Sequence, residues 1–269
     1  MTTATMGDAE YAEWIGEAAR ELAEIAAIVG ARTPVPACPG WTMRQLVGHV
    51  ISGLSGWYTY NLVNGSEPLD YGVSWSSQPQ PPRGNADRLV WLVDAADAFV
   101  DLVRSTDLDA PCYVFQSRRT GRAWLQRAAT ETAIHVRDAQ AVLGDIEPWG
   151  PARATASIDE TLRVMWHGAL LLRGDLDAER VPDQPITVVA TDLDLAWRVD
   201  KAVDDFTVEL VDAHTGQHSP VTPTDPSELF VAGESNELVP WLWGRATTNQ
   251  LTTTGDLAAI DAWNLSANI

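Results

Sequence analysis

The chain has 269 residues, of which 45% are hydrophobic and 20% are charged, and its formal net charge is −19. This composition predicts a globular protein with a hydrophobic core, organised as one large domain or two smaller ones. The acidic excess argues against nucleic acid and anionic membranes as partners, because both repel a negatively charged surface.

Cysteine content and the N-terminal sequence bear on the cellular compartment. The chain has two cysteines, Cys38 and Cys112, which are too few for a disulfide framework. The N-terminus lacks the basic and then apolar segments of a secretory signal. No apolar run reaches the ~20 residues that a membrane-spanning helix needs. We therefore expect a cytoplasmic protein with reduced thiols.

The first part of the chain is predicted to be helical. Apolar residues recur at helical spacing over residues 7–31. A Pro-rich turn follows, and Thr42 with Gln45 three residues later has the pattern of a capping box. A second helix is therefore expected to run from this point to about Val63. After a long Pro-rich connection at 64–85, further helices are expected at 86–105, 120–144 and 152–173.

The sequence pattern changes after the last of these helices. Residues 186–200 and 205–216 alternate between apolar and polar side chains, as strands do. A further strand, a Trp-rich helix, another strand and a short terminal helix are expected after them. The sequence thus predicts a helical bundle over residues 1–176 and a smaller α+β domain over residues 177–269.

Two of the predicted helices carry ionisable residues on their apolar faces. His49 has such a position on the second helix, and Glu131, His135 and Asp138 share a face of the fourth. A carboxylate buried alone costs several kcal/mol, so it must be paired, protonated or bound to a metal. Two histidines and a glutamate supply three ligands for a catalytic divalent cation, and the core of a helical bundle commonly holds such sites. Asp138 is suitably spaced to orient His135.

Two other interpretations of these residues are open on the sequence alone. Glu131 can form a surface ion pair with Arg127, which lies one turn earlier on the same helix. A histidine on an apolar helix face is also more often a hydrogen-bonded core residue than a metal ligand. Either interpretation leaves the chain without a metal site.

Three sequence motifs resemble the mycothiol-dependent maleylpyruvate isomerase family, which is part of the DinB-like metalloenzyme superfamily. The motifs are TPVPACPGWTMRQLVGHV at 33–50, RAATETAIHVRDAQ at 127–140 and LVPWLWGRATTNQLTTTGDLAAIDAW at 238–263. The resemblance implies a DinB-like four-helix bundle followed by a sterol-carrier-like α+β domain. It also implies a divalent metal, zinc, held by His49, Glu131 and His135, together with the thiol cofactor mycothiol.

The resemblance also implies a reaction and further site residues. A thiol bound to zinc is deprotonated at neutral pH and becomes a nucleophile for a small electrophile. The enzyme would then be an isomerase, which releases the thiol again, or an S-transferase, which leaves it attached. The resemblance makes Arg245 a candidate anion clamp for a substrate carboxylate, with a salt bridge at a domain interface as the alternative. Arg83 is a second candidate clamp because it lies in the loop at 64–85, and it matches no family motif. Helical spacing, and not the resemblance, places Trp57 and Trp124 on the faces that carry the predicted ligands, which makes them candidates for the apolar wall of a cofactor pocket.

A second function class stays open beside the enzyme. On the same fold, a non-catalytic protein would bind an apolar small molecule and carry a structural metal or none. The long loop at 64–85 also suggests a substrate other than maleylpyruvate. A monomer and a homodimer are equally compatible with the sequence.

Overall fold

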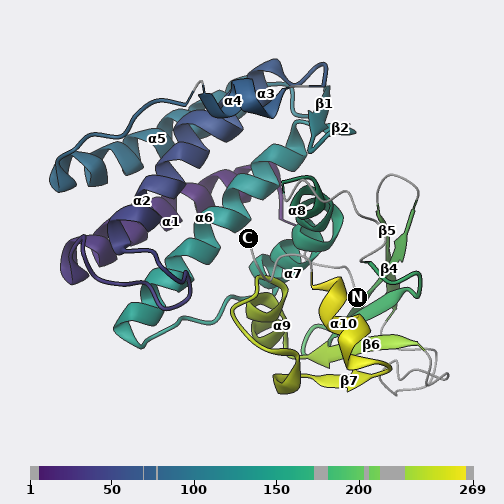
Figure 1. Cartoon of the computed structure of the whole chain (residues 1–269). Coiled ribbons are helices and arrows are strands. Elements are labelled where there is room, and N and C mark those ends of the chain that lie inside the picture. Colours follow the sequence, from purple (N-terminus) through teal and green to yellow (C-terminus); the bar gives the residue numbers. More distant parts are fainter. Residues whose placement is uncertain are drawn as a thin grey trace. The chain divides into compact units, whose positions relative to one another are not determined.

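The computed structural model describes residues 6–68, 70–76, 78–172, 181–202, 206–212 and 228–264, and Figure 1 shows the path of the chain. The described residues divide into two compact units. The first comprises residues 6–148, and the second begins at Trp149.

Four long helical segments build the first unit within its described residues. The second of them is continuous but changes from α-helix (α2) to π-helix (η1) and back (α3). Contacts join α1 to α5 and α6, and join α2 to the same two helices. The bounds of the segments are α1 Asp8–Val29, α2 Met43–Ser52, η1 Gly53–Tyr58, α3 Thr59–Asn64, α5 Asn85–Ser105 and α6 Arg122–Leu143.

These helices follow the expected ranges closely because their apolar residues are spaced for burial on one side. In α1, for example, Ile15, Ala19 and Leu22 are fully buried, which is the spacing of a single helix face. α6 differs, because it is buried around most of its circumference and includes buried polar residues such as Arg127 and Asp138. Such groups need partners inside the unit, and these partners form the site described below.

The connections between the long helices contain more structure than the sequence predicts. The segment expected to be a loop at 64–85 contains the short helix α4 (Tyr71–Ser76), and a β-hairpin precedes α6. Strands β1 (Pro111–Val114) and β2 (Ser117–Thr120) pair around a two-residue turn in which Phe115 and Gln116 both have positive φ. Such turns usually carry Asn or Gly, so these residues give no hairpin signal.

A mixed sheet of five strands forms the centre of the second unit within its described residues. The strand order is β5-β4-β3-β6-β7; β3 and β6 are parallel, and the other neighbours are antiparallel. Val189, Ala196, Phe230 and Ala232 form a buried cluster on the sheet. The bounds are β3 Ile186–Ala190, β4 Leu195–Lys201, β5 Phe206–Asp212, β6 Leu229–Gly233, β7 Thr252–Thr254, α7 Pro151–Glu160, η2 Thr161–Met165, α8 Trp166–Leu172, α9 Ser235–Leu242 and α10 Leu257–Trp263.

The division between the units comes earlier in the chain than the expected boundary at 176/177. That boundary falls in residues 173–180, outside the described residues, whereas the two units separate at 148/149. α7 packs against α9, and η2 packs against β5. Arg163 Nη1 also donates a hydrogen bond to the carbonyl oxygen of Val208 on β5 at 2.6 Å. The apolar spacing of this helical segment did not reveal that it packs on the later strands.

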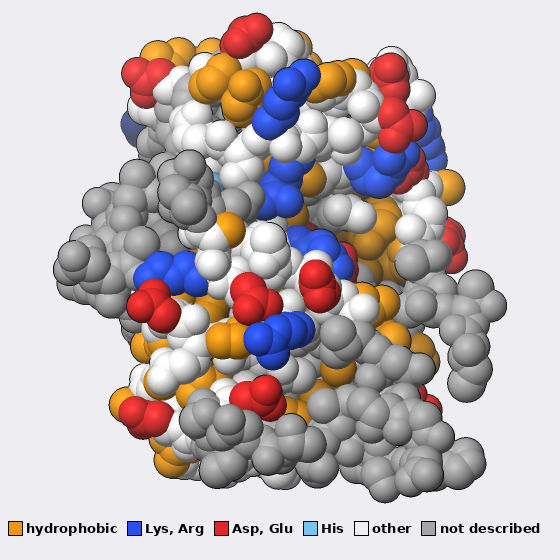
Figure 2. Space-filling view, turned by 90° about the vertical axis from the view of Figure 1, so that its right-hand side faces the viewer, with side chains coloured by type: hydrophobic (Ala, Val, Ile, Leu, Met, Phe, Trp, Pro, Cys, Tyr) orange, Lys and Arg blue, Asp and Glu red, His pale blue; other side chains and the backbone are white. Residues whose placement is uncertain are grey.

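The face of the molecule shown in Figure 2 carries charged side chains of both signs. In Figure 2, acidic and basic side chains are interspersed among neutral and hydrophobic ones across the described residues. None of the described helices combines the length and the apolarity that crossing a membrane requires.

Candidate metal centre

His49 on α2 meets Glu131 and His135 on α6. His49 Nε2 lies 3.1 Å from Glu131 Oε1, and His135 Nε2 lies 4.0 Å from the same oxygen. One ligand atom from each residue lies within 4.8 Å of the other two. The two imidazole rings are nearly perpendicular, with their centroids 4.9 Å apart.

The turn before α2 determines where His49 lies. The Trp41 carbonyl accepts a hydrogen bond from the Val35 amide at 2.9 Å, which closes the Pro-rich loop. At the start of the helix, the Thr42 amide donates to Gln45 Oε1 at 2.9 Å, as the capping-box pattern predicts. The fixed helix start places His49 two turns later, facing α6.

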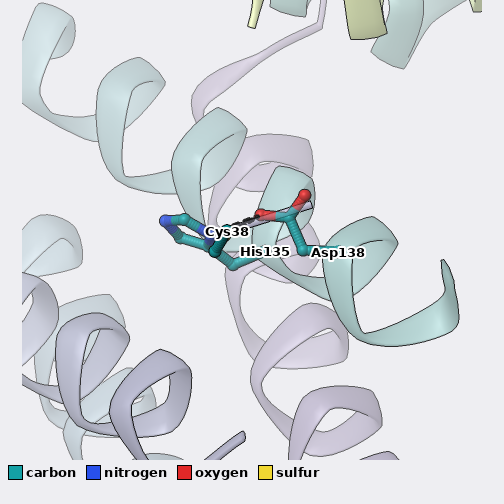
Figure 3. Close-up of side chains that lie close together, drawn as sticks. All are labelled: Cys38, His135 and Asp138. Carbon is teal, nitrogen blue, oxygen red and sulfur yellow. Dashed lines mark hydrogen bonds and ion pairs between the residues drawn. The ribbon is translucent and has the colours of Figure 1, made fainter. Parts of the chain in front are cut away.

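Asp138 holds His135 in a defined orientation. Asp138 Oδ2 lies 2.9 Å from His135 Nδ1 and also accepts a hydrogen bond from Cys38 Sγ at 3.2 Å. Figure 3 shows that the other ring nitrogen of His135 points away from Asp138. With the proton on Nδ1, the lone pair of Nε2 is free to bind a metal. Sequence spacing predicts the contact between Asp138 and His135, but it does not predict the hydrogen bond from Cys38.

Burial keeps the imidazole of His135 neutral. Desolvation lowers the pKa of His135, the positive charge of His49 lowers it further, and the hydrogen bond to Asp138 opposes this shift. Metal binding needs this neutral form. The side chain of His135 is 5% exposed and that of His49 is 35% exposed. The cluster is therefore open to solvent on the side of His49.

Arg127 is part of the cluster, whereas the sequence interpretation placed its ion pair with Glu131 on the surface. Its Nη2 lies 3.3 Å from Glu131 Oε1, so the ion pair considered from the sequence does form. The pair does not lie on the surface, however, because Arg127 is 3% exposed. Arg127 and His49 both contact Glu131 Oε1, and the positive charge of Arg127 offsets that of this largely buried carboxylate.

The donor set fits a divalent cation with three protein ligands. Zinc takes histidine nitrogens and carboxylate oxygens at about 2.0–2.2 Å, so adjacent ligand atoms in a tetrahedral site lie roughly 3.3 Å apart. The 3.1 Å between His49 Nε2 and Glu131 Oε1 is close to this value. His135 Nε2, at 4.0 Å from the same oxygen, needs only a small shift to come into range. Cys38, His135 and Asp138 form a second group of the same size, but hydrogen bonds within that group already use its ligand atoms.

Trp57 and Trp124, the two predicted cofactor contacts, pack against one another. Their ring centroids are 6.2 Å apart in an edge-to-face arrangement, and Trp124 also contacts Phe115. Trp124 lies about 10 Å along α6 from Glu131. Trp41 lies beside the histidines, with its ring centroid 5.0 Å from that of His49. The sequence feature that could have indicated this contact is the position of Trp41 directly before Thr42, the N-cap residue of α2.

The two predicted anion clamps, Arg83 and Arg245, lie in different units. Arg83 is exposed just before α5, and no hydrogen bond or ion pair among the described residues joins it to the histidines. Arg245 belongs to the second unit, where its Nη1 donates to the carbonyl oxygen of Trp243 at 2.7 Å. The roles of both arginines in anion binding remain predictions.

A family model described as the mycothiol maleylpyruvate isomerase N-terminal domain matches residues 15–140. This range contains the whole histidine and carboxylate cluster. Residues 15–140 therefore carry the sequence pattern of this domain. The match confirms the family that the sequence motifs indicated. No curated protein matches the chain significantly.

Two solved structures resemble both units of the chain. One is the crystal structure of the mycothiol-dependent maleylpyruvate isomerase, with 14% sequence identity. The other is a variant of that isomerase with a histidine replaced by alanine, with 13% identity. Each match has a TM-score of 0.51 and covers 92% of this chain and 93% of the other. The likeness shows a shared mixed fold of helices and sheet.

Proposed function

We propose that the protein is a metal-dependent enzyme that activates mycothiol, a low-molecular-weight thiol, for addition to a small electrophile. The observation that carries this proposal is the meeting of His49, Glu131 and His135 between α2 and α6. The N-terminal domain family supports mycothiol as the thiol, as does the likeness to a mycothiol-dependent isomerase. We further propose a DinB-like helical bundle and a sterol-carrier-like second domain as its framework.

Each residue of the cluster has a defined part in this proposal. When bound, a divalent cation, for which we propose zinc, lowers the pKa of a thiol and makes thiolate available at neutral pH. His49, Glu131 and His135 would hold the cation. Asp138 keeps the proton of His135 on Nδ1, so that Nε2 faces the cation. Arg127 holds Glu131 in place through their ion pair.

The remaining predicted residues concern substrate and cofactor recognition. We propose Arg83 of the first unit and Arg245 of the second as separate candidates for binding a carboxylate of the electrophile, since a guanidinium matches a carboxylate with two parallel hydrogen bonds. We propose that Trp57, with the fully buried Trp124 packed against it, forms an apolar wall for mycothiol. The reaction is either an isomerisation, which regenerates the thiol, or an S-transfer, which consumes it.

Thiol consumption and substrate conversion, measured together, test this proposal. The zinc-loaded protein is incubated with mycothiol and maleylpyruvate, and both compounds are followed over time. We expect conversion that requires mycothiol and falls at least about 100-fold in His49→Ala, because one of the three ligands is lost. Unchanged thiol indicates an isomerase, and stoichiometric loss of thiol indicates an S-transferase.

The matched control is His167→Asn, which replaces a buried histidine of the second unit and should leave conversion unchanged. Full activity in His49→Ala would contradict the proposal. Stabilisation by an apolar ligand but not by mycothiol, in a protein without turnover, would indicate the non-catalytic binding protein instead.

A further inference from the structure

A pocket of about 150 Å³ lies between the last turn of α1 and the first turns of α2 and α5. Its apolar wall includes Ala26, Met43 and Val47. Two arginines, Arg44 of α2 and Arg88 of α5, also line it. The pocket therefore combines a small apolar surface with two positive charges.

Neither arginine of the pocket has an acidic partner among the described residues. Arg44 Nη1 donates to the amide oxygen of Asn85 at 2.5 Å, and Arg88 Nη2 donates to the carbonyl oxygen of Pro82 at 3.1 Å. Both of these acceptors are neutral. By contrast, Arg122 of the same unit pairs with two aspartates. Two half-buried cations without a carboxylate are unexpected in a chain with a net charge of −19.

Arg88 in particular lacks compensation for its burial. Its Nε is buried and has no hydrogen-bond partner, which leaves one donor of the guanidinium unsatisfied. Burial and the nearby charge of Arg44 together lower the pKa of Arg88. The guanidinium lies against Gly48, where a Cβ atom would come within 2.6 Å of Arg88 Nη1. An anion in the pocket would relieve the repulsion between the two arginines.

The pocket is separate from the metal centre. Val47 and His49 are two positions apart on α2, so their side chains point in nearly opposite directions from the helix axis. Val47 lines the pocket against α1 and α5, whereas His49 faces Glu131 on α6.

We propose that this pocket binds a small organic anion. Its carboxylate or phosphate group pairs with Arg44 and Arg88, and its apolar body lies against Ala26, Met43 and Val47. An apolar cavity of about 150 Å³ accommodates a molecule the size of benzene, which limits the body of the ligand to about one ring.

Benzoate is a suitable probe, because it joins one carboxylate to one ring. We expect benzoate to bind saturably to the full chain at constant ionic strength and to raise its melting temperature. Benzyl alcohol, of similar size but neutral, should bind at least about tenfold more weakly. Inorganic phosphate is charged but has no ring, so its affinity shows whether the two arginines bind an anion without the apolar contacts.

Four variants test whether benzoate binds in this pocket. Arg44→Met and Arg88→Met should each weaken benzoate binding at least about tenfold, because each removes a charged hydrogen-bond donor. Ala27→Leu fills the mouth of the pocket from an exposed position of α1, keeps both arginines and should also weaken binding. Arg20→Met, the matched control, removes an arginine that pairs with Asp97 and should leave binding unchanged.

The metal site provides a separate control. His49→Ala should keep benzoate binding, because His49 lies on the other side of α2. Three results would overturn the proposal: no saturable benzoate binding to the folded protein, wild-type affinity for benzoate in both Arg44→Met and Arg88→Met, or loss of benzoate binding in His49→Ala. None of these results bears on the proposed thiol chemistry, which is measured through the metal cluster.

Discussion

At the scale of single residues, the cluster between α2 and α6 is a network of largely buried polar and charged groups that are hydrogen-bonded or ion-paired to one another. Asp138 is 2% exposed and receives hydrogen bonds from Cys38 and His135. Glu131 contacts His49 and Arg127. A buried carboxylate without such partners would be strongly destabilising. The network therefore holds the acidic groups in place and also leaves His135 Nε2 available.

Replacing Asp138 by Asn tests the orientation of His135. The amide keeps the size of the side chain but loses the charge that accepts from both Cys38 and His135. We expect the affinity for Zn²⁺ to fall about 10- to 100-fold, which is typical for the loss of a group that orients a ligand. Competition with a chromogenic chelator measures this affinity. The control is Asp97→Asn on the exposed surface of α5, and equal affinities in the two variants would refute the orienting role.

The lowered pKa of His135 predicts how stability depends on pH in the metal-free protein. The folded chain holds a neutral ring, whereas in the unfolded chain the ring titrates near about 6.5. Below that pH the unfolded state takes up a proton that the folded state resists, so the free energy of unfolding decreases as the pH falls. Above about pH 6.5 this contribution is constant.

Urea unfolding at a series of pH values checks this dependence. Between roughly pH 6.5 and 5, the wild type should lose stability more steeply than His135→Gln, which lacks the titrating ring. The difference between the two curves isolates His135 from His49 and the neighbouring carboxylates. Parallel curves would mean that the ring is not held neutral by burial.

At the scale of elements, the long helices were predictable because each carries a continuous apolar face. α6 was the informative helix, since its sequence places Glu131 and His135 one turn apart on a buried face. Arg127 was harder to interpret, because an arginine at that spacing is usually solvent-exposed. The hairpin before α6 was not predictable, because Phe115 and Gln116 are not the residues that such a turn normally requires.

The capping box of α2 connects the sequence motif to the position of His49. Thr42→Ala removes the cap and should lower the free energy of unfolding by about 1 kcal/mol. Gln45→Glu is the matched variant, because a glutamate also completes a capping box and suits a helix N-terminus. It should unfold at nearly the wild-type urea concentration. Equal losses in both variants would mean that the box does not determine the stability of α2.

At the scale of the whole molecule, the fold is shared with solved structures at only 13–14% identity. The apolar pattern maintains such a fold, since many sequences satisfy the same core. The same pattern could not assign the helical segment from Pro151 to Leu172 to its unit. An amphipathic face indicates burial, but it does not indicate against which partner.

The candidate ligands were predictable, whereas much of their surroundings was not. His49, Glu131 and His135 stand out because ionisable side chains on apolar faces are uncommon. Trp41 and Cys38 reach the cluster through the turn before α2, whose path depends on tertiary contacts. Helical spacing carries no information about such a turn.

The metal content of the purified protein tests the central claim most directly. Protein prepared without a histidine tag or chelator is analysed by mass spectrometry, together with His49→Ala and the control His167→Asn. The account predicts about one zinc ion per chain in the wild type and the control, and loss of the metal in His49→Ala. Well-folded wild-type protein without stoichiometric metal, or an equal metal content in His49→Ala, would contradict it.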